Sequence, residues 1–200
     1  MIELVLATRN QGKFKELTSL IALRQPGIIL HSLNGFKYID VEEDYTTFHE
    51  NAYKKATTIL KQIKLPCLAD DSGLEVDALF GKPGVQSARF AGPKVNDLEN
   101  RTKLLDELKP VPLEKRTARF RCALVLSFPD GKNFSAEGVL EGQILTEPRG
   151  CQGFGYDSLF FVPSLGKTLA EILQEEKNQL SHRAKAFEEL FRKLHVSLKI

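Results

Sequence analysis

The N-terminal third of the chain alternates short aliphatic runs with stretches of helical spacing, and this alternation restricts the fold more than any other feature. Ile2 to Ala7 is too short for a helix, and it gives way after Gly12 to apolar residues at helical intervals. Ile28 to Leu30 is typical of a second strand, and Cys67 to Ala69 of a third. Strands that alternate with helices are typical of β-α-β units, so we predict an α/β fold.

Two helices carry explicit start signals. Thr47–Glu50 has the form of a capping box before a run with helical spacing, which Pro66 ends. Asn96–Glu99 is a second capping box, and the helix that it opens should place its leucines on one side: Leu98, Leu104, Leu105 and Leu108.

The remainder of the chain predicts a hairpin and then helices. Thr117 to Phe128 alternates apolar and polar residues, and Pro129–Gly131 supplies a turn into a second alternating run. From about Thr168 to Leu194 the apolar residues lie mostly at helical intervals. There is no internal repeat and no linker rich in Gly and Ser, so we expect residues 1–200 to form a single domain.

Composition narrows the function classes. The 200 residues are 42% hydrophobic and 27% charged, and the net charge of +2 is too small to argue for nucleic-acid or membrane partners. The three cysteines form no CxxC pair, which favours reduced thiols over a disulfide framework. The N-terminus has no basic leader, and no 18-residue apolar stretch occurs. We therefore expect a soluble, cytoplasmic protein that binds neither nucleic acid nor membrane.

Two adjacent carboxylates, Asp70 and Asp71, follow the third predicted strand and precede a Ser-Gly pair that should turn the chain. Like charges at the end of a buried strand need a cation or strong donors as compensation. Carboxylate oxygens suit Mg²⁺, whereas the alternative is an Asx turn without metal. The acidic stretch Val41–Asp44 could contribute to such a site or could be a solvated loop.

Thr8–Lys13 stands where the first strand gives way to a helix, a place where backbone N–H groups and the helix dipole favour an anion. Lys13 would add a positive charge, and Asn10 and Thr8 would add neutral hydrogen bonds. The alternative is that Asn10 and Gly12 only form a turn. A phosphate site together with a magnesium site would indicate a nucleotide ligand.

Two further segments are rich in polar groups or glycine. Gly150–Asp157 combines glycines with two aromatic residues and an acid, which suits contact with a flat ligand or, alternatively, a tight corner of the chain. Glu175–Lys177 and Ser181–Arg183 lie near a helix start for which Ser181 is a suitable N-cap. Taken alone, these residues could be an ordinary helix surface.

Taken together and in this order, the segments resemble the inosine triphosphate pyrophosphatase family over nearly the whole chain. The resemblance is carried by LATRNQGKFKEL, TFHENAYKKA, LADDSGLEVDALFGKPGVQSARFAG, GFGYDSLFFVP and KTLAEILQEEKNQLSHRAKAF. It implies two lobes around a mixed β-sheet with flanking helices and a central substrate cleft. It also implies a homodimer and a Mg²⁺-dependent cleavage of ITP, dITP and XTP to a nucleoside monophosphate and pyrophosphate.

The resemblance also assigns the catalytic and phosphate-binding residues. Asp71 would bind the metal and accept the proton of the attacking water, and Asp70 would support it. Glu43, rather than Glu42, would be the second metal ligand. Lys55 matches a lysine that faces the triphosphate. The phosphate-contacting loop matches Thr8, Arg9, Asn10, Gln11, Gly12 and Lys13.

Base recognition is implied for a third group of residues: Ser72, Phe154, Gly155, Tyr156, Asp157, Lys177, His182 and Arg183. Donors at residues 182–183 should face purine O6, which is an acceptor in hypoxanthine and xanthine but is replaced by an amino group in adenine. Adenine would leave buried donors unpaired, at about 1 to 3 kcal/mol each. Ser158 stands where relatives commonly have proline.

Two other functions stay open. A related hydrolase for other modified nucleotides would share the phosphate machinery and differ only in the base that it accepts. A non-catalytic nucleotide-binding protein would bind without turnover, which the filled catalytic positions disfavour. The sequence also lacks the basic, aromatic stripe that is typical of single-stranded nucleic-acid binding.

Overall fold

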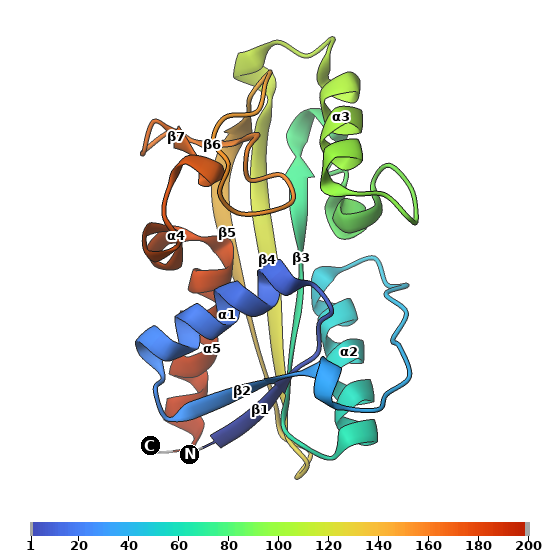
Figure 1. Cartoon of the computed structure of the whole chain (residues 1–200), viewed down its shortest axis with the longest axis vertical. Helices are drawn as coiled ribbons and strands as arrows, with labels where there is room; N and C mark the ends of the chain where they lie inside the picture. The colour runs from blue at the N-terminus through green and yellow to red at the C-terminus, as the bar shows by residue number, and fades with distance from the viewer. Residues whose placement is uncertain (1, 199–200) are drawn as a thin grey trace. The chain divides into compact units, whose positions relative to one another are not determined.

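A computed structural model describes residues 2–198 of the chain (Figure 1). Among these residues there is no helix that is long and apolar enough to span a membrane. The elements in chain order are β1 (Ile2–Leu6), α1 (Gln11–Arg24), β2 (Ile28–Ser32), α2 (Phe48–Ile63), β3 (Cys67–Val76), α3 (Asp97–Leu108), β4 (Thr117–Ser127), β5 (Asn133–Ile144), β6 (Phe160–Val162), β7 (Lys167–Thr168), α4 (Gln174–Leu180) and α5 (His182–Leu198), with short 3₁₀ turns between some of them.

The strands form one seven-stranded sheet in the order β2-β1-β3-β4-β5-β6-β7. The pairs β1–β2 and β1–β3 are parallel, whereas β5–β6 and β6–β7 are antiparallel. The sheet is therefore mixed and helices flank it, which confirms the predicted α/β class. The chain divides into two compact units, whose boundaries fall within β3, β4 and β5: unit 1 is Met1–Asp71, Cys122–Gly138 and Ser181–Ile200, and unit 2 is Ser72–Arg121 and Val139–Leu180.

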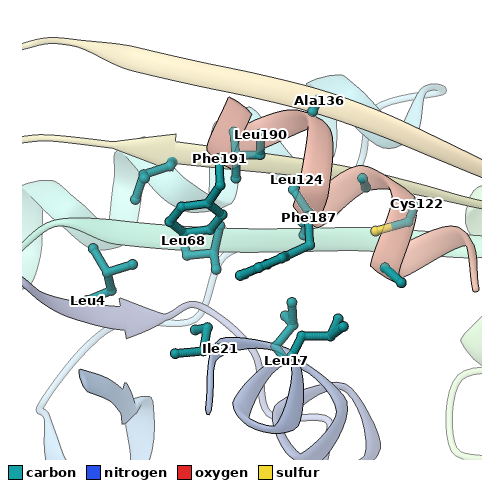
Figure 2. Packing of buried hydrophobic residues seen from close by; sticks show 14 of the residues in the cluster. Leu4, Leu17, Ile21, Leu68, Cys122, Leu124, Ala136, Phe187, Leu190 and Phe191 are labelled. Carbon is teal, nitrogen blue, oxygen red and sulfur yellow. The ribbon is translucent and has the colours of Figure 1, made fainter. Parts of the chain in front are cut away.

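The core of unit 1 lies between its strands and the helices α1 and α5 (Figure 2). Leu4 and Leu6 of β1 and Leu68 of β3 face this core, because alternate residues of a strand share a face. Helix α1 contributes Leu17 and α5 contributes Phe187. Burial of this apolar surface, at about 25 cal/mol per Å², fixes the helices on that face and so fixes their first turns.

Unit 2 has an apolar core of its own. Residues of β3, α3, β4 and β5 contribute to it, and Leu74, Leu104 and Phe160 are completely buried. In α3 the buried positions Asn100, Leu104 and Leu108 recur every four residues, which places them on one stripe of the helix. Leu98 lies off this stripe and is 63% exposed. The prediction that Leu98 shares the buried side is therefore wrong.

Most predicted elements are confirmed at their predicted places. Asn10, Thr47 and Asn96 cap α1, α2 and α3, and the Asn96 capping box is complete. A second prediction needs correction: β3 does not end at Ala69 but runs to Val76, so the Asp pair lies inside a strand and the Ser-Gly pair forms no turn. The strand can continue because the buried carboxylates receive partners from helices, as described below.

Candidate active site

Asp70 and Asp71 are neighbours in β3, and successive strand residues point to opposite faces of a sheet. Asp70 contacts Lys13 of α1 and Arg183 of α5, whereas Asp71 lies near Lys55 of α2. The strand therefore points the two carboxylates to opposite faces, where different cations contact them. This arrangement reduces the repulsion between them, although Asp70 still raises the pKa of Asp71.

Asp70 lies at the centre of a buried charge cluster. Lys13 Nζ is 2.6 Å from Asp70 Oδ1, and Arg183 Nε donates to Oδ2 at 2.7 Å. Arg183 also pairs with Glu16 of α1, and Cys122 Sγ lies 3.4 Å from Asp70 Oδ2. Burial alone would raise the pKa of Asp70, but Arg183 and Lys13 hold that pKa well below its usual range. Asp70 is thus a permanent anion that holds Lys13 near the start of α1.

Asp71 is less well compensated. Lys55 Nζ is 3.9 Å from Asp71 Oδ1 but only 2.5 Å from Glu43 Oε1, so two carboxylates share one ammonium group. Asp71 Oδ2 is buried and has no hydrogen-bond partner among residues 2–198. Burial raises the pKa of Asp71 to about 6, and Glu43 and Asp70 add to the rise although Lys13 and Lys55 oppose it. Counted by themselves, ionised Asp71 and Glu43 carry one more charge than the Lys55 ammonium between them neutralises.

The donor set around Asp71 fits a divalent cation. Asp71 and Glu43 supply hard carboxylate oxygens, and one of these oxygens is buried without a partner. Within the described chain no group of three or more His, Cys, Asp or Glu side chains could hold a metal ion. Mg²⁺ at nucleotide sites commonly takes only one or two carboxylates and completes its shell with water and phosphate. Asp71 and Glu43 are therefore the residues that could hold such an ion.

The loop Thr8–Lys13 leads from β1 into α1. Asn10 Oδ1 accepts the backbone N–H of Lys13 at 3.0 Å, and Thr8 Oγ1 accepts that of Asn10 at 3.2 Å. These bonds confirm that the loop is a helix-capping turn. Arg9, Asn10 and Gln11 are exposed, and Gly12 is half-buried, so backbone at this helix start is accessible to an anion. The phosphate-binding role of the loop stays a prediction.

In unit 2, three of the predicted base-binding residues lie together. Asp157 Oδ2 accepts the backbone N–H of Phe154 at 3.0 Å and pairs with Lys177 Nζ at 2.6 Å. The same ammonium lies 5.2 Å from the centre of the Phe154 ring. Gly153 has a φ of +75°, and a Cβ there would collide with the Asp157 carboxylate. The buried Asp157–Lys177 pair therefore fixes the shape of the loop that presents Phe154.

Neighbours in unit 2 hold the rest of this loop. Asp97 Oδ2 accepts the N–H of Gly155 at 2.7 Å, and Arg101 donates to the Gly155 carbonyl at 2.8 Å. The Tyr156 hydroxyl donates to the carbonyl of Ser87 at 2.8 Å, and its ring is buried in the core of unit 2. Ser72 is the first residue of unit 2 and lies within β3, half-buried. Tyr156 is thus held as a core residue by contacts that the sequence did not predict.

His182 and Arg183 open α5 in unit 1, where Ser181 Oγ accepts the N–H of Ala184 at 3.1 Å, as expected of an N-cap. Both side chains are buried. The Arg183 guanidinium donates to Asp70 and pairs with Glu16, so its observed partners are carboxylates. The role of residues 182–183 in base recognition stays a prediction.

Sequence analysis missed Glu16 and Gly138 at this site. Glu16 stands within an ordinary helix pattern, and only the tertiary contact with Arg183 distinguishes it. Gly138 lies in β5 where α5 passes so closely that a Cβ would collide with the carbonyl oxygen of His182. This close approach brings the first turn of α5, and with it Arg183, beside the strands.

The mixed sheet and the residues around Asp71 and Lys13 define a class: an α/β protein with a candidate cation site next to a cationic helix start in unit 1. The Ham1 family model matches residues 4–193. The chain belongs to the Ham1 family.

Relatives and solved structures agree with this family membership. The chain is 51% identical to the dITP/XTP pyrophosphatase of Geobacillus kaustophilus, over 95% of this chain and 93% of that protein. It is 52% identical to the dITP/XTP pyrophosphatase of Geobacter sulfurreducens, over 93% of each. A solved HAM1 protein from Coxiella burnetii superposes with a TM-score of 0.86 at 43% identity, over 97% of this chain and 98% of that one. The Ham1 protein of Staphylococcus aureus gives 0.85 at 38%, over 98% and 99%.

Proposed function

We propose that this chain is a nucleoside triphosphate pyrophosphatase that hydrolyses the non-standard purine nucleotides dITP, ITP and XTP to a monophosphate and pyrophosphate. Relatives about half identical over almost the entire chain are dITP/XTP pyrophosphatases, which supports the substrate class. The observation that carries the chemistry is Asp71, a buried carboxylate that has one unpartnered oxygen and shares the Lys55 ammonium with Glu43.

Asp71 and Glu43 would hold the metal, which we propose to be Mg²⁺. When bound, the ion supplies positive charge that stabilises the phosphate oxygens of the substrate. Lys55 already bridges the two carboxylates and would adjust its position as the metal binds. Its ammonium can then turn toward the triphosphate, which is the role that the resemblance to the family implies for this lysine.

Asp71 also accepts the proton of the attacking water in this proposal. Without metal, burial raises the pKa of Asp71 to about 6; a bound divalent cation would lower that pKa, so Asp71 would be ionised at neutral pH and able to accept the proton. The water oxygen then forms the new bond to phosphorus, the α–β phosphoanhydride bond breaks, and pyrophosphate leaves. The reaction needs no covalent intermediate.

The loop Thr8–Lys13 would bind the phosphate chain. Lys13 is held by Asp70 at 2.6 Å, so its position is set before substrate arrives, and little conformational entropy is lost on binding. The first N–H groups of α1 add neutral donors. Together they would stabilise charge that develops as the pyrophosphate leaves.

For the base we propose the residues that the resemblance implies: Ser72, the loop 154–157, Lys177, His182 and Arg183. The half-buried Phe154 ring, backed by the Lys177 ammonium, supports stacking on a purine.

We further propose that the enzyme works in the cytoplasm as a homodimer. Size-exclusion chromatography with light scattering would test the assembly.

The decisive experiment measures pyrophosphate release from dITP, XTP, dATP and dGTP, each with Mg²⁺ and with EDTA. We expect metal-dependent release from dITP and XTP, and release from dATP and dGTP slower by orders of magnitude. A modified pyrimidine triphosphate is assayed as a fifth substrate, and a rate equal to that on dITP would favour the related hydrolase instead. Binding of dITP without any pyrophosphate would favour a non-catalytic nucleotide-binding protein.

A further inference from the structure

We propose that Asn51 and Gln62 of α2 are positioning residues for metal binding, which hold the segment 39–45 so that Glu43 stays beside Asp71. This inference rests on the proposed function in one respect, namely that Glu43 and Asp71 share a divalent cation. The hydrogen bonds of the two amides go to the backbone of Ile39 and Tyr45 and not to the proposed metal ligands.

The segment that carries Glu43 has no regular structure to hold it. In the described chain, residues 37–44 belong to neither helix nor strand. Figure 1 shows this part of the chain, in light blue, running beside α2 before it enters that helix. Irregular segments gain a fixed position only from contacts with the elements around them. The place of Glu43 must therefore be set by its neighbours.

Two side-chain amides from α2 supply such contacts. Asn51 Oδ1 accepts the N–H of Tyr45 at 3.0 Å, and its Nδ2 donates to the Tyr45 carbonyl at 3.2 Å. Gln62 Oε1 accepts the N–H of Ile39 at 2.6 Å, and its Nε2 donates to the Ile39 carbonyl at 3.1 Å. Each amide thus satisfies both backbone groups of one residue, as a neighbouring strand would do.

Lys55, which lies between Asn51 and Gln62 in α2, makes a third contact with the segment: its Nζ lies 2.5 Å from Glu43 Oε1. With 100° per residue, Asn51, Lys55 and Gln62 point within about 40° of one another, so they form one stripe of α2. Their partners run in the opposite direction, since 51, 55 and 62 contact residues 45, 43 and 39. The segment therefore lies antiparallel along the helix.

The lengths of the two chains leave little slack. Eleven helical residues from Asn51 to Gln62 rise about 16 Å. Six extended residues from Ile39 to Tyr45 span at most about 20 Å. A segment fixed at both ends over such a span is close to straight. Release of either end would let Glu43 move away from Asp71, and the two carboxylates would then bind a shared ion more weakly.

The other contacts of the segment are less suited to this task. Arg9 contacts Tyr38 and Asp40, and the Arg9 and Asp40 side chains are 63% and 62% exposed. Lys54 pairs with an exposed Asp44. Exposed ion pairs contribute little and weaken with salt. Asn51, by contrast, is 1% exposed; Gln62 is half-buried, and because both amides are neutral, salt does not screen their hydrogen bonds.

The test compares Gln62→Met with Lys61→Met in the full-length protein. Gln62→Met removes both bonds to Ile39 with little change in size, whereas Lys61 is the exposed neighbour on the same helix turn. Binding of Mn²⁺, a paramagnetic probe, is measured by electron paramagnetic resonance without nucleotide. Hydrogen exchange of the Ile39 amide is measured alongside.

We expect Gln62→Met to weaken Mn²⁺ binding by about 3- to 30-fold and to speed exchange at Ile39. Lys61→Met should bind Mn²⁺ within about twofold of the wild type. Because Glu43 itself is intact, kcat of Gln62→Met at saturating metal should be near the wild-type value while the metal requirement rises. If Gln62→Met does not fold, Gln62→Glu, which keeps the acceptor for Ile39 N–H but loses the donor, should show a smaller shift in the same direction.

Faster exchange at Ile39 with unchanged Mn²⁺ affinity would overturn the proposal, and so would a loss of thermal stability without a change in affinity. Failure of the underlying site has a different signature. If Glu43→Gln and Asp71→Asn both bind Mn²⁺ as the wild type does, the metal lies elsewhere, whatever Gln62→Met shows.

Discussion

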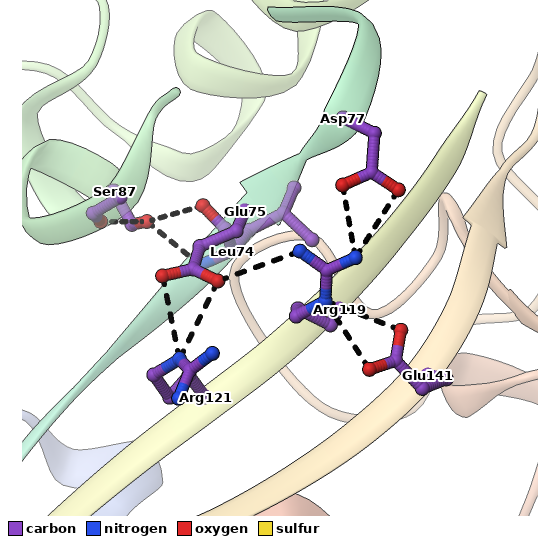
Figure 3. A network of polar contacts seen from close by, with 8 residues as sticks. Leu74, Glu75, Asp77, Ser87, Arg119, Arg121 and Glu141 are labelled. Carbon is purple, nitrogen blue, oxygen red and sulfur yellow. Dashed lines mark hydrogen bonds and ion pairs between the residues drawn. The ribbon is translucent and has the colours of Figure 1, made fainter. Parts of the chain in front are cut away.

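Two clusters of carboxylates and cations, one in each unit, use the same chemical groups at very different exposure. The buried cluster of unit 1 consists of Lys13, Asp70, Arg183 and Glu16. The exposed cluster of unit 2 is built around Arg119, whose guanidinium lies 2.9 Å from Asp77, 3.2 Å from Glu141 and 3.8 Å from Glu75 (Figure 3). Side-chain exposure is 2% for Arg183 and 0% for Asp70, but 26% for Arg119 and 68% for Glu141.

The fold should depend on these two clusters to different degrees. In the exposed cluster water can replace any partner that is lost, so each pair contributes little. In the buried cluster a lost partner leaves a charge that water cannot reach. The buried cluster also ties α1 and α5 to β3, and it fixes the Lys13 ammonium that we propose to meet the phosphate.

The largest effect should follow Arg183→Met. This change leaves the carboxylates of Asp70 and Glu16 buried without the guanidinium that pairs with both of them, while Lys13 still pairs with Asp70. We expect a loss of about 3 to 5 kcal/mol in the free energy of unfolding, measured with urea. Adding Glu16→Gln to Arg183→Met should restore part of the stability, because one uncompensated charge is removed. Exposed pairs contribute at most about 1 kcal/mol. If Arg183→Met alone lost less than that in the free energy of unfolding, the buried cluster would not differ from the exposed one.

Asp71→Asn should separate stability from function. The amide removes a charge that Lys55 and its surroundings only partly compensate, so in EDTA we expect stability to be unchanged or higher by up to about 2 kcal/mol. Hydrolysis of dITP should be lost, because the amide neither accepts the proton nor holds the metal well. A folded variant that keeps most of its turnover would contradict the proposed mechanism.

Thiol reactivity reports whether solvent reaches the buried cluster. Cys122 lies beside Asp70, and burial raises the pKa of the Cys122 thiol well above the usual value. Burial also raises the pKa of Cys67 to about 12. Cys151, by contrast, is exposed. Of the three thiols, a disulfide reagent at pH 8 should therefore modify only Cys151 rapidly in the native protein. In Arg183→Met, Cys122 should react sooner than in the wild type. Rapid modification of Cys122 in the native wild type would show that water enters the cluster.

The sequence predicts local features well because they depend on neighbours in the chain. The caps at Thr47 and Asn96 and the strand before Gly12 follow from short patterns, and the structure confirms them. The end of β3 was predicted wrongly, because local chemistry suggests a turn at Ser72-Gly73. Partners that lie far away in the chain decide the matter: Lys13 and Arg183 neutralise Asp70 and let the strand continue.

In the candidate active site, too, contacts between residues far apart in the chain could not be predicted from local patterns. Motif resemblance indicated Asp71, Glu43 and Lys55, and the structure brings these residues of unit 1 together. Resemblance could not reveal that Asp70 is a permanent anion while Asp71 has a raised pKa, because both follow from burial and from which face each residue occupies. The hydrogen bonding of Asn51 to Tyr45 could not be predicted either, because the sequence does not indicate which partner an amide within a helix will contact.

A small effect is expected for Arg119→Met in the exposed cluster. Arg119 has several acidic partners, but water reaches all of them, so we expect a loss below about 1 kcal/mol in the free energy of unfolding. The difference between variant and wild type should shrink in 1 M salt. A loss as large as that of Arg183→Met would mean that exposure does not separate the two clusters.

The smallest effect concerns the pH dependence of the exposed cluster. The Thr117 hydroxyl, which donates to Asp77 at 2.6 Å, is the main cause that lowers the pKa of Asp77, and Arg119 adds to it. A carboxyl whose pKa is lower in the folded state stabilises the fold above its unfolded value, and this contribution is lost as pH falls through the folded pKa. Wild type should therefore exceed Asp77→Asn in stability at pH 7, by less than about 1 kcal/mol because Asp77 is partly exposed, and the gap should close toward pH 3.

Salt distinguishes the two causes of that gap. Salt screens the ion pair with Arg119 but leaves the short hydrogen bond from Thr117 largely unaffected. Most of the pH-dependent gap between wild type and Asp77→Asn should therefore persist in 1 M salt, whereas Thr117→Val should remove most of it at low salt. If salt abolished the gap and Thr117→Val left it intact, the ion pair would be the main stabiliser. Even in the exposed cluster, then, the contact that we expect to shift a pKa most is a neutral donor at short range.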